Sequence, residues 1–339
     1  MVMFTTRLSA SAGGPTNHKP APRRELRASG YDGAPKMVLG ADLKGTTVAT
    51  RVYLDYDQDG LDAQYNNRVR FPEYAEHFAN WRTWSDQARA EMTAHLDVPF
   101  GDDPSERLDV FPAARRDAPI YIFTHGGYWY SLDKADYSYV ARGMAPHGVM
   151  TVVPNHGLAP GYRMDEIVRQ SRAALAWLWH HAADYGGDRE RIYVAGHSAG
   201  GHLGMMQLGT DWPKFDHEFG GEVRGDLIKG ACTISGIFDL EPIRLSYLNR
   251  TLTLDAAEAA RNSPLSLNYP PKTPLMMVVG DPESAEYQRQ NHAMAARWRA
   301  LGAPLDWVAP PGLNHFNLVN QLIDPESDLV RAQLNVWAR

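Results

Sequence analysis

The sequence lacks the features that mark several classes of protein. Cys232 is the only cysteine among 339 residues, so the chain cannot form an internal disulfide, which is typical of a reducing compartment. No apolar run approaches the ~18 residues that a membrane-spanning helix needs. The apolar stretch at residues 1–4 is also too short for a signal peptide. We therefore expect a cytoplasmic protein.

An excess of positive charge is also missing. Lysine and arginine number 34 against 40 aspartates and glutamates, which gives a net charge of −6. Such a chain has no basic field to attract nucleic acid or anionic lipid. With 44% hydrophobic residues it has ample material for a large core. We expect a globular protein that binds neither nucleic acid nor membranes.

The sequence also lacks the common cofactor and metal motifs. There is no His-Glu-x-x-His segment, no pair of cysteines and no carboxylate cluster at metal-ligand spacing. No G-x-G-x-x-G segment follows a predicted strand, and no phosphate-binding Gly-Lys-Ser/Thr loop occurs. We therefore expect no metal and no cofactor.

Two parts of the chain differ in pattern. Residues 1–46 carry no hydrophobic period and read as an extended arm, either exchanged between the subunits of a homodimer or disordered. Residues 47–339 read as one domain, with a short strand over 47–53 and a helix over 73–95.

From about residue 107, short apolar runs alternate with helical stretches. This alternation predicts βαβ units, and hence an α/β fold with a mainly parallel central sheet and helices on both faces. In such sheets the chemistry lies at the carboxyl ends of the strands. The predicted strands are Arg107–Phe111, Ile120–Phe123, Val149–Pro154, Arg191–Ala195, Leu227–Ser235, Leu275–Val279 and Leu305–Val308, and the clearest helices span 164–182 and 284–301.

A Gly-His-Ser-Ala-Gly segment, residues 196–200, directly follows one predicted strand and precedes a helical run. G-x-S-x-G between a strand and a helix is typical of a nucleophile elbow, in which small residues let the turn expose the serine. The bare pattern also occurs by chance in glycine-rich turns, but the flanking elements favour Ser198 as a nucleophile.

A His-Gly-Gly-Tyr-Trp segment, residues 125–129, follows the strand at 120–123. Its glycines leave room for a carbonyl oxygen to approach the backbone N–H groups of Gly126 and Gly127, which with Ala199 would form an oxyanion hole. Tyr128 and Trp129 are expected either to line an aromatic substrate pocket or to pack in the core.

A nucleophilic serine needs a base and an orienting carboxylate. His315 follows the last predicted strand, which is the place of the base in a hydrolase with the order Ser, acid, His. Asp281 and Glu283 both follow the strand at 275–279 and are both candidates for the acid. Asp281 precedes a proline and is more simply a turn residue.

These segments resemble the kynurenine formamidase (arylformamidase) and carboxylesterase group of α/β-hydrolases. The resemblance rests on residues 125–129, 196–203, 235–242 and 280–284, and extends to Leu61–Arg68, so it covers about residues 55–339. It implies Ser198 as nucleophile, Glu283 as acid and His315 as base. The chain departs from the group's usual Asn-Tyr-Arg-Leu-Ala-Pro-Glu segment at residues 155–161, where it reads Asn-His-Gly-Leu-Ala-Pro-Gly.

The resemblance implies a serine hydrolase that cleaves a small ester or an aryl formamide through an acyl-enzyme. A hydrolase of xenobiotic amides or carbamates is the alternative enzyme, and a non-catalytic binding module is the alternative of another class. Asn66, Asn67 and Arg68 are expected to cap a helix. The alternative is that they lie at the mouth of the site.

Overall fold

The computed structural model describes residues 50–338 apart from 216–220, 222 and 271. The predicted arm, residues 1–46, lies outside the described residues, as does the start of the strand predicted over 47–53. Residues 50–53 form no strand and contribute only an isolated bridge between Tyr53 and Tyr56. This part of the prediction is wrong.

One eight-stranded sheet forms the centre of the described chain, in the order β1-β2-β4-β3-β5-β6-β7-β8. The pairings β1–β2 and β2–β4 are antiparallel, and every later pairing is parallel. The predicted α/β-hydrolase fold is therefore confirmed. The strands are β1 His95–Pro99, β2 Arg107–Phe111, β3 Ala118–Thr124, β4 Met150–Pro154, β5 Gly187–His197, β6 Ile228–Ile234, β7 Leu275–Val278 and β8 Leu305–Val308.

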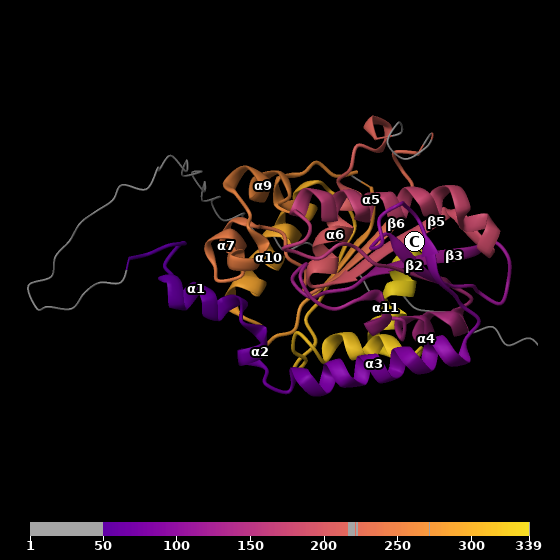
Figure 1. Cartoon of the computed structure of the whole chain (residues 1–339), viewed down its shortest axis with the longest axis horizontal. Helices are drawn as coiled ribbons and strands as arrows, with labels where there is room; N and C mark the ends of the chain where they lie inside the picture. The colour runs from indigo at the N-terminus through magenta and orange to yellow at the C-terminus, as the bar shows by residue number, and fades with distance from the viewer. Residues whose placement is uncertain (1–49, 216–220, 222, 271, 339) are drawn as a thin grey trace, which may run out of the picture. The chain divides into compact units, whose positions relative to one another are not determined.

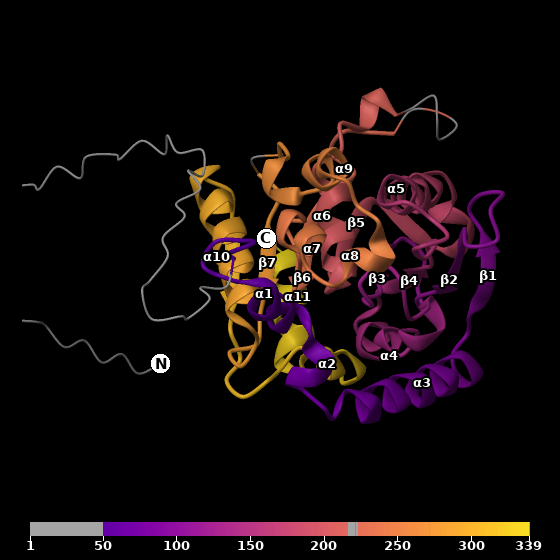
Figure 2. The same cartoon turned by 60° about the vertical axis from the view of Figure 1, so that its left-hand side comes forward.

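Helices cover both faces of the sheet, as Figures 1 and 2 show. Helices α5, α6 and α10 lie on one face, and α3, α4 and α11 lie on the other. None of the helices in the described residues is both long and apolar enough to cross a membrane. The helices are α1 Gln58–Tyr65, α2 Asn67–Arg70, α3 Tyr74–Glu91, α4 Val140–Met144, α5 Met164–His181, α6 Ala199–Leu208, α7 Glu241–Leu245, α8 Asn249–Leu252, α9 Ala256–Arg261, α10 Ala285–Ala300 and α11 Asp328–Trp337.

Short 3₁₀ turns complete the connections between these elements. They span Lys134–Asp136, Ala145–His147, Ala182–Tyr185, Trp212–Lys214, Pro264–Ser266 and Leu318–Ile323.

The core has two layers because consecutive side chains of a strand point to opposite faces of the sheet. In β7, Met277 packs in the layer that contains Trp298 of α10, while Met276 packs in the layer that contains Trp81 of α3. Parallel strands that are buried on both faces, such as β6 and β7, are nearly continuous apolar runs in the sequence. These two strands could therefore be predicted from the sequence.

A third apolar cluster lies beyond the carboxyl ends of the strands. It joins α1 and the short helices α7 to α9 to the loops that follow β3 and β6. These elements surround the region in which the predicted site residues lie.

Candidate active site

Ser198 stands in a sharp turn between β5 and α6. Its backbone has φ 55° and ψ −117°, a conformation that L-residues rarely adopt and that active sites hold at a cost of about 1–3 kcal/mol. The flanking glycines make the turn possible. A Cβ on Gly196 would lie 2.3 Å from the carbonyl of Gly200, and a Cβ on Gly200 would lie 2.0 Å from the carbonyl oxygen of Thr124.

His315 and Glu283 meet through a buried hydrogen bond. The Nδ1–H of His315 donates to Oε2 of Glu283 at 2.7 Å. The other carboxylate oxygen, Oε1, accepts from Ser235 Oγ at 2.5 Å and from the backbone N–H of Gly280 at 2.8 Å. Because both oxygens are held, the carboxylate fixes the ring orientation of His315 and leaves its Nε2 free to act as a base.

Asp281, the other candidate for the acid, lies apart from the imidazole. Its Oδ1 accepts from the backbone N–H of Gly312 at 2.8 Å in an exposed turn. Asp281 therefore fixes the loop that leads toward His315, and Glu283 alone of the two carboxylates contacts the ring.

The loop after β3 packs directly against the elbow. A Cβ on Gly126 would lie 3.2 Å from Cβ of Ser198. Gly127 has φ +115°, and a Cβ there would lie 2.0 Å from the carbonyl oxygen of Ser131, so only glycine fits. The backbone of Gly126 and Gly127 therefore lies beside the turn that carries Ser198 and Ala199, which is where the sequence predicts the oxyanion hole.

Tyr137 lies beside the glycine loop, where its ring packs 6.1 Å from that of His125, and burial raises the pKa of its hydroxyl well above the ordinary value. The Tyr137 hydroxyl donates to Nδ1 of His197 at 3.2 Å, and Nε2–H of His197 donates to the backbone carbonyl of His315 at 2.8 Å. These two bonds join Tyr137, the nucleophile strand and the loop of His315.

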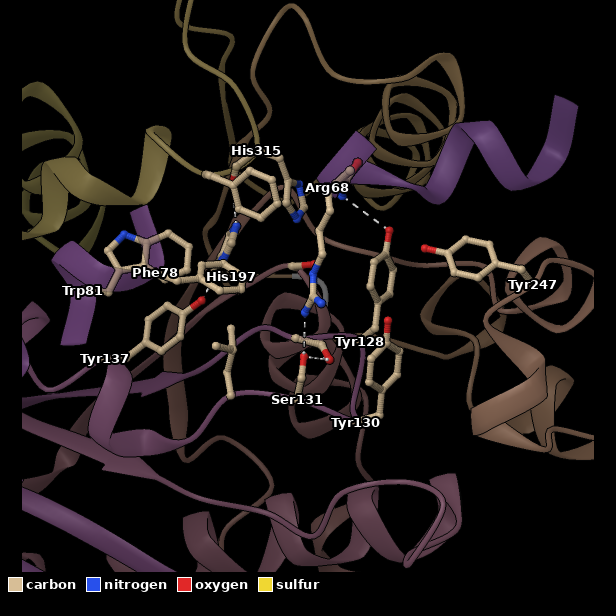
Figure 3. Close-up of a pocket in the computed structure, with 15 residues that line it drawn as sticks. Arg68, Phe78, Trp81, Tyr128, Tyr130, Ser131, Tyr137, His197, Tyr247 and His315 are labelled. Atoms are coloured by element: carbon tan, nitrogen blue, oxygen red, sulfur yellow. Dashed lines mark hydrogen bonds between the residues drawn. The ribbon is translucent and has the colours of Figure 1, made fainter. Parts of the chain in front are cut away.

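A cavity of about 440 Å³ opens onto Ser198 and His315 (Figure 3). Its walls are mainly aromatic and come from segments far apart in the sequence. The lining residues are Asn67, Arg68, Phe78, Trp81, Gly127, Tyr128, Tyr130, Ser131, Leu132, Tyr137, His197, Ser198, Tyr247, His315 and Phe316.

The two aromatic residues of the 125–129 segment differ in position. Tyr128 lines the cavity, and its hydroxyl donates to the backbone carbonyl of Tyr65 at 2.7 Å. Trp129 is fully buried in the third apolar cluster, and its indole N–H donates to Nδ1 of His202 at 3.2 Å. Of the two alternatives expected for Trp129, the structure shows packing in the core and no place in the cavity wall.

Two contributions to the site were not assigned from the sequence. Tyr287 on α10 packs its ring 4.8 Å from the His315 ring and donates its hydroxyl to that of Tyr128 at 2.9 Å. Its position four residues after Glu283, in the first turn of a helix, was the available signal. Asn66 caps α2 as expected, whereas Asn67 and Arg68 line the cavity.

Three buried histidines near the site have pKa values below the ordinary one. Burial is the main cause in each case. It lowers the pKa of His156 to about 3 and that of His202 to about 4. The pKa of His197 lies well below its usual range because of burial and of the nearby charge of His315.

These histidines predict a loss of stability in mild acid. Below about pH 6.5 the unfolded chain binds protons that the folded chain excludes, so each histidine lowers the free energy of unfolding by about 1.4 kcal/mol per pH unit. Above that pH both states are neutral and the contribution disappears. Urea unfolding at pH 7 and pH 5 checks this, with His156→Gln expected to show a shallower dependence than the parent chain. An unchanged slope in that variant would contradict the assignment of His156.

No cluster of three or more histidine, cysteine, aspartate or glutamate side chains placed to hold a metal occurs in the described part of the chain. Cys232 is buried in β6, where burial raises the pKa of its thiol.

Comparison with known proteins agrees with this geometry. The model of the BD-FAE family matches residues 108–281, just over half of the chain. The kynurenine formamidase of Danio rerio is 28% identical over 82% of this chain and 96% of its own length, and that of Salmo salar is 29% identical over 84% and 98%. A crystal structure from Silicibacter sp. TM1040, of a protein provisionally described as a thioesterase, superposes with a TM-score of 0.69 at 29% identity, over 80% of this chain and 97% of that one.

The matched family region contains the glycine loop and the elbow. The chain therefore belongs to the BD-FAE family and is an α/β-hydrolase of the group that contains the kynurenine formamidases and carboxylesterases.

Proposed function

We propose that this protein is a serine hydrolase that cleaves a small ester or an aryl formamide through an acyl-enzyme intermediate. The observation that carries the proposal is the buried 2.7 Å hydrogen bond between His315 and Glu283, since His315 lines the same cavity as Ser198. A base held by a carboxylate beside a serine on a strained turn is the arrangement that nucleophilic acyl transfer requires.

In the first half of the proposed reaction, Oγ of Ser198 attacks the substrate carbonyl carbon while Nε2 of His315 takes the hydroxyl proton. Glu283 stabilises the resulting imidazolium. The carbonyl oxygen becomes an oxyanion, and the backbone N–H groups of Gly126, Gly127 and Ala199 are the proposed donors to it.

In the second half, the imidazolium of His315 gives its proton to the leaving amine or alcohol as the bond to the acyl carbon breaks. A water molecule then loses a proton to Nε2 of His315 and attacks the acyl-enzyme. The acid product leaves, and the proton returns to Oγ of Ser198.

The cavity supports a small, partly aromatic substrate. Rings such as those of Trp81 and Phe316 form its walls, and pockets for small molecules are typically lined by apolar and aromatic side chains. The names of the relatives, formamidases on one side and esterases on the other, support both bond types as candidates.

Labelling with a fluorophosphonate probe tests the proposal. The reagent should modify the folded protein stoichiometrically at Ser198, and heat-denatured protein should not react, because the serine is activated only in the folded site. The labelled peptide is identified by mass spectrometry. A folded chain that resists the probe would instead indicate a binding module.

A substrate panel then separates the bond types. We expect turnover of para-nitrophenyl acetate and N-formylaniline, with slower turnover of aryl carbamates and long-chain esters because the cavity is small. Turnover of the ester with no detectable hydrolysis of the formamide would restrict the proposal to carboxylesterase activity.

A further inference from the structure

The cavity has an unbalanced charge. None of the fifteen residues that line it is an aspartate or glutamate, and Arg68 is the one lysine or arginine among them. A small substrate that enters this space meets a fixed positive charge and no lining carboxylate.

The guanidinium of Arg68 is held in place without being neutralised. It lies over the rings of Tyr74 and Phe78, at 5.4 and 5.6 Å from their centroids, and its Nη2 lies 3.4 Å from Oγ of Ser131. Within the described ranges, no carboxylate lies within salt-bridge distance of it. Cation–π contacts orient a guanidinium but leave most of its N–H donors available.

Other arginines of the chain show the contrast. Arg244 pairs with Glu241 at 2.7 Å, and Arg289 pairs with Glu286 at 2.8 Å, so each is already neutralised within the fold. Arg68, on the short helix α2, lines the cavity and has no such carboxylate partner among the described residues.

Two tyrosine hydroxyls complete the surroundings of this charge (Figure 3). Tyr130 and Tyr247 line the same cavity as Arg68, and the Tyr247 hydroxyl donates to the backbone carbonyl of Tyr65 at 3.4 Å. Burial raises the pKa of both tyrosines, that of Tyr247 to about 12, and the charge of Arg68 opposes the rise in both. The carboxylate of Asp62 also acts on Tyr247, but it already accepts hydrogen bonds from the Tyr247 backbone N–H and from Gln58.

We propose that Arg68, with the hydroxyl of Tyr130, forms a subsite for a carboxylate carried by the substrate away from the bond that is cleaved. A guanidinium offers paired N–H donors that match the two oxygens of a carboxylate, and a neutral hydroxyl adds a donor without adding charge. This inference rests on the proposed hydrolase function, and it narrows the substrates to carboxylate-bearing esters or amides.

A matched substrate pair tests the subsite. para-Acetoxybenzoate and para-acetoxybenzamide carry the same acetyl group and the same ring, and they differ in charge at the far end. The measured quantity is the ratio of kcat/KM for the carboxylate to kcat/KM for the carboxamide. In Arg68→Gln this ratio should fall about tenfold, the scale of a charge-assisted contact at a partly exposed position, and Arg68→Lys should restore part of it.

Arg70→Gln is the control, because Arg70 lies two residues away on the same helix, is exposed and does not line the cavity. It removes the same formal charge and should leave the ratio within twofold of the parent value. Raising the salt concentration should lower the ratio in the parent chain and leave it unchanged in Arg68→Gln, since screening acts only on the charged contact.

Equal losses for both substrates in Arg68→Gln would overturn the subsite, because they would indicate a structural role. An equal fall of the ratio in Arg70→Gln would also overturn the subsite. Such a result would show that any nearby positive charge favours the carboxylate, without a specific contact. A binding measurement separates these failures from failure of the proposed function. Calorimetry with the products para-hydroxybenzoate and para-hydroxybenzamide should show tighter binding of the carboxylate, lost in Arg68→Gln, even if the chain hydrolyses neither ester.

Discussion

Ser198→Ala should lower kcat for a small aryl ester by about 10⁴-fold or more. Removing the nucleophile of a serine hydrolase leaves only the rate enhancement that binding and the oxyanion hole provide, and comparable enzymes lose between about 10⁴ and 10⁶ in kcat. The measurement is steady-state turnover of para-nitrophenyl acetate, together with loss of fluorophosphonate labelling.

Ser266→Ala provides the control, because Ser266 is an exposed serine in a 3₁₀ turn outside the cavity. Its turnover should match that of the parent chain. Thermal unfolding of Ser198→Ala should stay close to the parent curve, since alanine occupies less space and inherits the same backbone. Turnover within tenfold of the parent would contradict the acyl-enzyme mechanism.

Glu283→Gln should lower kcat by about 10³- to 10⁴-fold with little change in fold. Oε1 accepts two hydrogen bonds, from Ser235 and Gly280, so the amide oxygen of glutamine is expected to take that position. The amide NH₂ would then face Nδ1 of His315, which must become an acceptor. The proton moves to Nε2, and the ring can no longer take a proton from Ser198.

Asp281→Asn tests the alternative carboxylate at the same end of the same strand. Because Asp281 accepts a hydrogen bond from the backbone N–H of Gly312 in an exposed turn and does not contact the imidazole of His315, its replacement should change kcat less than threefold. If Asp281→Asn lowered kcat as much as Glu283→Gln, the assignment of Glu283 as the acid would be contradicted. Circular dichroism of both variants shows whether either change is a loss of folding.

The central strands and long helices could be read from the sequence because their patterns are local. The helices predicted over 164–182 and 284–301 are found as Met164–His181 and Ala285–Ala300. The helix predicted over 73–95 ends at Glu91, and His95 instead begins β1. That edge strand was missed because most of its side chains are exposed and show no alternation of apolar and polar residues.

The short helices α7 to α9 also escaped prediction. Each has between four and six residues, less than the length over which helical periodicity can be recognised, and tertiary packing supplies most of the stability of such helices. Their buried residues join the third apolar cluster, whose members come from distant parts of the chain.

The candidate triad and the glycine loop could be named because each follows a predicted strand, and parallel strands bring their carboxyl ends together. The residues that form the walls of the cavity could not be predicted from the sequence. Trp81 reaches the site because α3 packs across the sheet, where its ring lies 5.2 Å from that of Tyr137. No local pattern distinguishes such a residue from an ordinary core tryptophan, or Tyr128 from Trp129 beside it.

The cavity walls coincide only partly with the matched family region. Ser198 and the glycine loop lie in that region, at 108–281, whereas Arg68, Phe78 and Trp81 lie on α2 and α3, ahead of it. Membership of the family therefore does not specify the side chains that α2 and α3 place in the cavity. Two members with the same nucleophile turn can differ in the pocket in front of it.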